Sequence, residues 1–247
     1  MENRDEKAFV KNDKIALLGC VNGILLYTLV WASLVKLVMM LILGDYYKTF
    51  VTEQKSLALL ICMCFAIILT TITSVIIAKP ESIHNSLKKI KKADIKFMFT
   101  SLGAMFAFNL VYNLILITLK VDITGGNTNQ MEILDRMTAN VPLAFFTMVL
   151  LAPGCEEITY RYFLYGGISK YNRKLAIIIS GFVFMLVHAT FDFQAGVNQV
   201  LRELILLPPY MFSGMVLAYA YDKKESLLIP IAIHALNNGF SFILSLI

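Results

Sequence analysis

Three polar clusters lie within stretches of sequence that are otherwise apolar enough for a lipid bilayer. A charged group near the bilayer centre costs about 2.5–3.5 kcal/mol on insertion scales, so a retained one suggests a functional site. Carboxylate, imidazole and amide groups can activate water and bind an oxyanion. We therefore expect one intramembrane active site built from distant segments. Its candidate residues are Glu156, Glu157 and Arg161 in the first cluster, His188 in the second, and His234 with Asn238 in the third.

The two adjacent glutamates are predicted to have different tasks. Glu157 and Arg161 are four residues apart, which brings their side chains together on one face of a helix in the favourable acid-first order. In a low-dielectric setting this pair would largely satisfy both charges. Glu156 points about 100° away and has no local partner. An unpaired, desolvated carboxylate suits a general base, and Glu156 is our candidate.

The two histidines are interpreted together with these acids. His234 and Asn238 are also four residues apart, so an imidazole N–H and an amide N–H could bind an oxyanion from one helix face. His188 follows Phe184 by about one turn and could share a water molecule with Glu156. Either histidine alone is more often a structural residue of a helix bundle. Both of them beside an acidic pair favour a catalytic role.

The composition predicts an all-α, polytopic membrane protein. Hydrophobic residues make up 58% of the 247 residues, charged residues make up 16%, and the mean hydropathy is +0.70. Soluble domains carry about 25% charged residues, and a helical span takes about 20 apolar residues. The chain thus has room for about seven, possibly eight, transmembrane helices in one compact membrane domain. The predicted helices are 15–43, 57–78, 97–119, 141–165, 174–191, 203–221 and 226–247.

Positive charge predicts the orientation of this bundle. With the N-terminus in the cytoplasm, the seven predicted helices leave sixteen lysines and arginines on the inner side and five on the outer side. The basic run 88–92 then reads as a loop at the membrane edge that contacts anionic lipid. Nucleic-acid binding is a remote alternative for it.

Other polar residues in the apolar segments are first given structural interpretations. Asn109 and Asn113 are four residues apart and favour hydrogen bonding between helices, with lining of a substrate cavity as the alternative. Asn237 is interpreted as structural. Lys36 lies toward the outer end of the first helix, where its ammonium group can snorkel to the interface.

The three clusters also carry a family resemblance. Residues 156–161 read Glu-Glu-x-x-x-Arg, residues 184–188 read Phe-x-x-x-His, and residues 234–238 read His-x-x-x-Asn. In this order and within membrane helices they resemble the CPBP family, named for CAAX proteases and bacteriocin-processing enzymes and also called Abi. The resemblance covers about 141–247, as a catalytic helical core. Residues 1–140 are then variable N-terminal transmembrane helices.

The resemblance implies an intramembrane endopeptidase of the CAAX-protease type. Its substrate would be a membrane-associated protein or peptide, such as a prenylated CAAX-type tail or a leader or bacteriocin-type peptide. In the family the first glutamate and first histidine activate water, while the second histidine and the asparagine stabilise the oxyanion. These roles fall on Glu156, His188, His234 and Asn238.

A cofactor and a location are expected on weaker grounds. The family has often been labelled as metalloproteases, and two histidines with a carboxylate can also bind Zn²⁺. The chain has no His-Glu-x-x-His motif, so we favour hydrolysis that depends on glutamate and needs no metal. The compact, all-membrane form suggests a prokaryotic plasma membrane.

Two functions from other classes remain open. Buried acids, arginine and histidine can also form the relay of a proton-coupled transporter, although the chain has no evident repeat symmetry of the kind many transporters show. A non-catalytic immunity or scaffold protein would keep the fold and lose hydrolysis. Its expected mark is an eroded motif, and all three motifs here are intact.

Overall fold

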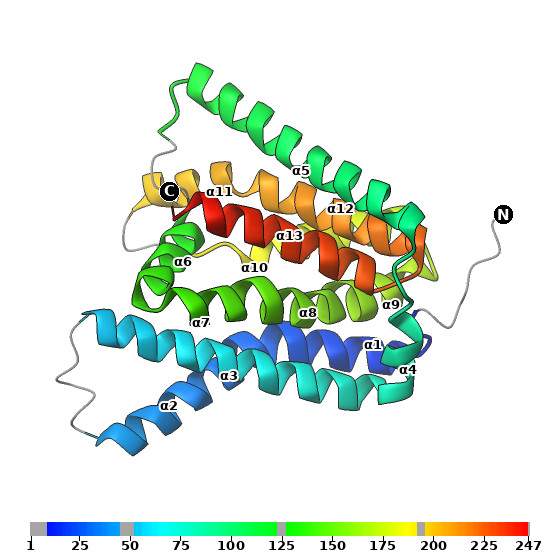
Figure 1. The fold of residues 1–247 in the computed structure, drawn as a ribbon, viewed down its shortest axis with the longest axis horizontal. Coiled ribbons are helices and arrows are strands. Elements are labelled where there is room, and N and C mark those ends of the chain that lie inside the picture. Colours follow the sequence, from blue (N-terminus) through cyan, green and yellow to red (C-terminus); the bar gives the residue numbers. More distant parts are fainter. Residues whose placement is uncertain (1–8, 45–51, 123–126, 192–195, 247) are drawn as a thin grey trace.

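The computed structural model describes residues 9–44, 52–122, 127–191 and 196–246, and every regular element in these ranges is helical (Figure 1). The predicted all-α fold is confirmed, and each predicted apolar helix has a counterpart. In chain order the elements are α1 (Asp13–Cys20), η2 (Val21–Trp31), α2 (Ala32–Leu43), α3 (Thr52–Ala78), α4 (Pro80–Ser86), α5 (Lys92–Thr118), α6 (Thr128–Ala139), α7 (Val141–Phe145), η4 (Phe146–Leu151), α8 (Ala152–Glu157), η5 (Ile158–Tyr165), α9 (Gly166–Ser169), α10 (Arg173–Val187), α11 (Val197–Leu206), α12 (Pro208–Lys224) and α13 (Leu228–Leu244).

Several of these helices have the length and composition of membrane spans. Within the described part of the chain, four are long and apolar enough to cross a bilayer: Gln54–Ala78, Lys92–Thr118, Val141–Ser169 and Val197–Lys224. The segments Ser33–Leu43 and Leu228–Leu244 are shorter apolar helices. The protein is therefore an integral membrane helix bundle, while the predicted number of seven spans stays a prediction.

Three short helices, α4, α6 and α11, were not expected. Two of them lie together at one end of the bundle, α6 after the long helix α5 and α11 before α12 (Figure 1). Their sequences mix charged and apolar residues, so a search for long apolar stretches passes over them. The prediction had started the sixth helix at residue 203, inside α11.

The acidic motif lies in the middle of a continuous helical segment from α7 to α9. The regular turn of α8 contains Pro153 and both glutamates, and a π-helical stretch lies on each side of it, η4 before and η5 after. Proline has no N–H to donate to the preceding turn. Single π-helical turns inside α-helices are frequent at functional sites.

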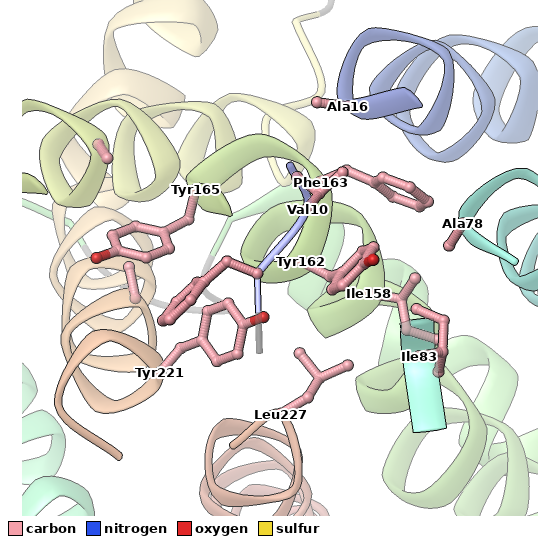
Figure 2. Close-up of a cluster of buried hydrophobic side chains, with 13 residues drawn as sticks. Val10, Ala16, Ala78, Ile83, Ile158, Tyr162, Phe163, Tyr165, Tyr221 and Leu227 are labelled. Carbon is pink, nitrogen blue, oxygen red and sulfur yellow. The ribbon is translucent and has the colours of Figure 1, made fainter. Parts of the chain in front are cut away.

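The segment η5 is anchored by a core of buried apolar side chains (Figure 2). Ile158, Tyr162 and Phe163 of η5 share this core with residues of α1, α3, α4 and α12. The N-terminal helix approaches η5 through glycines. A Cβ atom at Gly19 would lie 2.2 Å from the ring of Phe163, and one at Gly23 would lie 2.1 Å from Thr159 Oγ1. Small residues permit this close packing of membrane helices, which fixes the acidic helix from one side.

Glycines also bring α10 against α12. A Cβ atom at Gly214 of α12 would lie 2.9 Å from the Cα atom of Gly181 in α10. The close crossing sets the relative position of the C-terminal end of α10, where His188 lies, and the first turns of α12.

Candidate active site

The innermost part of the site is a buried chain of three charged or titratable side chains. Arg161 Nε lies 2.8 Å from Glu157 Oε2, and both side chains have no exposed surface. The other carboxylate oxygen, Glu157 Oε1, accepts a hydrogen bond from His234 Nδ1 over 2.9 Å. The ion pair predicted from the spacing is present. Since a carboxylate only accepts, the proton of this contact is on Nδ1, and Glu157 fixes the orientation of the His234 ring.

Arg161 is held by further contacts that the spacing did not reveal. Its guanidinium carbon lies 4.9 Å from the centre of the Phe184 ring, and Nη1 donates to Ser180 Oγ over 3.4 Å. Ser180 Oγ in turn donates to the carbonyl of Tyr160 over 2.9 Å. The cation therefore bridges the acidic helix and α10.

Glu156 lies beside this chain and faces open space. Its Oε2 atom is 3.9 Å from His234 Nε2, and that oxygen is buried without a hydrogen-bond partner among the described residues. The side chain as a whole keeps 28% of its surface exposed. Glu156 thus has the arrangement expected for a group that contacts a water molecule or substrate.

His188 ends α10 and lies against the same space. It is the C-cap residue, since α10 stops at Val187 and not at residue 191 as predicted. His188 Nδ1 lies 2.6 Å from the carbonyl oxygen of Phe184, so Nδ1 carries the proton and a neutral ring leaves Nε2 as an acceptor. The ring stacks on Tyr210 of α12, with centroids 4.7 Å apart and planes inclined by 26°.

Asn238 completes the set from α13. Its Nδ2 atom donates to the carbonyl of Met148 in η4 over 3.0 Å. A side-chain amide has two N–H groups, so one of them is available for a further acceptor. The structure brings Glu156, His188, His234 and Asn238 to the wall of one cavity of about 440 Å³.

The asparagines that were interpreted as structural also line this cavity. Asn113 Nδ2 donates to Asn109 Oδ1 over 2.9 Å, and both side chains border the cavity. They bond to each other within α5, so the alternative of cavity lining is the one that the structure favours. Asn237 lines the cavity as well.

A second cavity, of about 350 Å³, lies on the other side of Glu156 and His188. Both cavities are bordered by these two residues and by Met63, Arg136 and Ala152. Glu156 and His188 therefore lie where the two spaces meet, and a chain passing from one cavity to the other would run past them.

Sequence reasoning missed two residues that contact His188, Asn127 and Tyr210, and a third, Glu203, that holds the residue after Asn127. Asn127 donates from Nδ2 to the carbonyl of His188 over 3.5 Å and accepts at Oδ1 from Tyr210 Oη over 3.3 Å. Glu203 of α11 is 1% exposed and accepts from the backbone N–H of Thr128 over 2.5 Å. Asn127 precedes a helix and is a typical N-cap residue, and Glu203 is a carboxylate in an apolar stretch. Both signals were present in the sequence.

The donor set does not gather as a metal centre. Across the described ranges, no three His, Cys, Asp or Glu side chains come close enough together to hold a metal ion. The site as it stands is a set of acid–base and hydrogen-bonding groups.

Comparison with known proteins gives this site a family. Residues 138–240, which contain all three motifs, match the model of the type II CAAX prenyl endopeptidase Rce1-like family. The match supports the predicted resemblance to the CPBP family. The family is one of membrane proteases, in agreement with the apolar helices.

Whole-chain comparison points the same way. The chain is 27% identical to the membrane-embedded CAAX protease MroQ of Staphylococcus aureus (strain USA300), over 89% of this chain and 91% of that protein. It is 25% identical to the UPF0177 protein YxdF of Lactococcus lactis over 61% of this chain and 78% of that protein. A putative membrane peptidase of Bacillus subtilis, YdiL, is 31% identical over 48% of this chain and 43% of its own length. No solved structure is significantly similar to the chain.

Proposed function

We propose that this CPBP-family protein is an intramembrane endopeptidase in which Glu156 activates the attacking water. One observation carries the assignment. The Oε2 atom of Glu156 has no hydrogen-bond partner among the described residues and lies 3.9 Å from a histidine whose other nitrogen is held by Glu157. An unpartnered carboxylate oxygen beside a positioned imidazole, on a cavity wall, suits water activation.

The reaction assigns one task to each residue of the cavity wall. Glu156 takes a proton from a water molecule that also donates to His188 Nε2, and the water oxygen attacks the carbonyl carbon of the scissile peptide bond. The resulting oxyanion accepts hydrogen bonds from the free amide N–H of Asn238 and from Nε2–H of a His234 that carries protons on both nitrogens. Glu156 then returns its proton to the leaving amine as the C–N bond breaks, so no proton is gained or lost overall.

Glu157 and Arg161 act on this reaction indirectly. Glu157 holds His234 through Nδ1 at 2.9 Å, and Arg161 compensates the buried charge of Glu157. We propose both as positioning residues. Under this proposal the two glutamates are not interchangeable, and Glu156 alone serves as the base.

The substrate that we propose is a peptide presented at the membrane, either a prenylated CAAX-type tail or a leader-type peptide. The support is the relation to a CAAX protease and to the Rce1-like family. The larger cavity is bordered by several side-chain amides, which can donate to and accept from a peptide backbone.

The test is cleavage of a panel of prenylated and leader-type peptides by the purified protein, with products identified by mass. We expect cleavage by the wild type, a loss of about 10²–10⁴-fold in His188→Ala, and no loss in His84→Ala. His84 is exposed on α4, away from both cavities, and is the matched control. The proposal would be contradicted if the wild type cleaved no peptide, or if His188→Ala cleaved as fast as the wild type.

Metal dependence is decided in the same assay. We propose glutamate-based hydrolysis without a metal, on the basis of the Oε2 atom of Glu156, which is unpartnered among the described residues, and the lack of a His-Glu-x-x-His motif in the sequence. Cleavage should therefore persist in the presence of a chelator. Loss of cleavage that Zn²⁺ restores would replace this mechanism with a metal-dependent one.

We also propose that the N-terminus is cytoplasmic in a prokaryotic plasma membrane, on the basis of the lysine and arginine bias. Asn85 on α4 and Asp135 on α6 are exposed and lie at opposite ends of the bundle (Figure 1). A membrane-impermeant thiol reagent applied to intact cells should label Asp135→Cys and leave Asn85→Cys unlabelled. The opposite pattern would invert the topology.

A further inference from the structure

The smaller of the two cavities differs from the larger one in the charge of its wall. Its border includes Lys36 and Arg136 together with Glu156. The larger cavity shares Arg136 and Glu156 with it and is otherwise bordered by amides, hydroxyls, the two histidines and apolar side chains, so Lys36 is the charged residue that borders the smaller cavity alone. Beyond the proposed base, the smaller cavity is thus a positively charged space.

Lys36 is unusual in its own helix. The segment α2 reads ASLVKLVMMLIL, so Lys36 is the single charged residue among apolar ones. A lysine within an apolar membrane helix is costly and commonly faces a cavity or a partner. Lys36 borders the same cavity as Glu156. Facing this cavity explains the position of the lysine in an apolar helix as well as snorkelling to the interface does.

Arg136 brings the second positive charge from α6. Its Nη2 atom lies 2.6 Å from Glu132 Oε2, and its side chain keeps 23% of its surface exposed. Glu132 borders neither cavity, so that ion pair holds the guanidinium from the far side. A guanidinium has five N–H donors, and one carboxylate partner leaves donors for a second.

We propose that this cavity binds a carboxylate of the substrate close to the scissile bond; the inference rests on the proposed peptidase function. Arginine recognises carboxylates with good geometry, and a lysine on the same wall adds attraction. The same cavity, of about 350 Å³, is bordered by Glu156, so a carboxylate bound in it lies close to the bond that Glu156 is proposed to cleave. The carboxylate is therefore a free C-terminus or an acidic side chain near the cleaved bond.

The test compares matched peptides that differ in one carboxylate. One pair carries a free or an amidated C-terminus, and a second pair carries Glu or Gln near the scissile bond. For the wild type we expect KM to be about ten- to hundredfold lower for the acidic member of one pair, with a similar kcat. The pair that shows the preference identifies the source of the carboxylate.

Variants assign that preference to the cavity. Arg136→Gln should abolish it and Lys36→Met should reduce it, while Lys55→Met should leave it intact. Lys55 is an exposed lysine of α3 that borders neither cavity. Equal KM values for both members of each pair in the wild type would overturn the proposal. So would an unchanged preference in Arg136→Gln or, if that variant does not fold, in Lys36→Met.

Binding separates this inference from the proposed function. The same peptides are titrated against protein carrying Glu156→Gln, with and without Arg136→Gln. Tighter binding of the acidic peptide that depends on Arg136 supports the carboxylate site even if no peptide is cleaved by the wild type. Cleavage without any carboxylate preference would leave the peptidase proposal standing and remove this one.

Discussion

Two arginine–carboxylate pairs of this bundle differ in how the arginine binds the two oxygens of its carboxylate partner. Arg173 donates to both oxygens of Asp222, over 2.7 Å from Nε and 2.6 Å from Nη2, and Asp222 also accepts from Tyr165 Oη. Arg161 contacts one oxygen of Glu157 at 2.8 Å, and the other oxygen accepts from His234. We call the first pair closed, because Arg173 binds both oxygens of Asp222. In the second pair, one oxygen of Glu157 binds the imidazole of His234 at the cavity wall.

The difference shows which buried charges are structural. A bidentate arginine–carboxylate pair engages both oxygens of the carboxylate, and Arg173 with Asp222 ties the start of α10 to the end of α12. The Glu157–Arg161 pair lies within one helix and adds no tie between helices by itself. Its consequence is the fixed orientation of His234, whose Nε2 atom faces Glu156.

The largest expected effect comes from breaking the fully buried pair. In Arg161→Met, Glu157 stays buried without its cation, which should lower the free energy of unfolding by about 3–5 kcal/mol and abolish peptide cleavage. Thermal unfolding in detergent and the cleavage assay measure the two effects. The double variant Arg161→Met with Glu157→Leu should recover much of the stability and remain inactive. Recovery of cleavage in the double variant would contradict a positioning role for the pair.

Breaking the closed pair should affect stability alone. Arg173 is 47% exposed, so solvent can partly replace it. We expect Arg173→Met to lower the free energy of unfolding by about 1–3 kcal/mol and to leave kcat unchanged at temperatures where the protein is folded. A kcat loss as large as that of Arg161→Met would show that the two pairs do not differ in the way described.

The smallest effect is expected at the exposed contact between α1 and the end of α9. Hydrogen bonds from Lys170 and from Tyr171 hold the pKa of Asp13 below its ordinary value of 3.8. A lowered folded-state pKa means that the contact contributes its full stability above 3.8 and loses it as the pH falls through the folded-state value. The melting temperature of Asp13→Asn should therefore lie slightly below that of the wild type at pH 7, and the gap should narrow as the pH falls below 3.8. A gap that widens in acid would contradict this assignment.

Much of the site followed from local spacing. The contact of Glu157 with Arg161 depends on a four-residue interval in a helix, and the interval alone predicts it. The separate direction of Glu156 follows from the same geometry. These predictions succeed because the positions of side chains around one helix are fixed by the helical repeat.

The contacts between helices did not follow from the sequence. The bond from His234 to Glu157 depends on how α13 meets the acidic helix, and no local interval encodes it. His188 is supported by Asn127 at the start of α6 and by Tyr210 of α12, and Glu203 of α11 holds the first residue of α6. The short helices α6 and α11 have mixed polarity, which hides them from a hydropathy search. The ring tautomer of His188 likewise depends on the end of α10 at Val187, four residues before the predicted end at 191.

The central claim is that Glu156, and not its neighbour, activates water. The most direct measurement is the single-turnover cleavage rate of Glu156→Gln on a peptide that the wild type cleaves, with the melting temperature measured on the same preparation. We predict a rate at least about 10²–10⁴-fold below that of the wild type with an unchanged melting temperature, because Glu156 forms no ion pair at hydrogen-bonding distance with the described residues. A Glu156→Gln protein that cleaves at the wild-type rate would contradict the account.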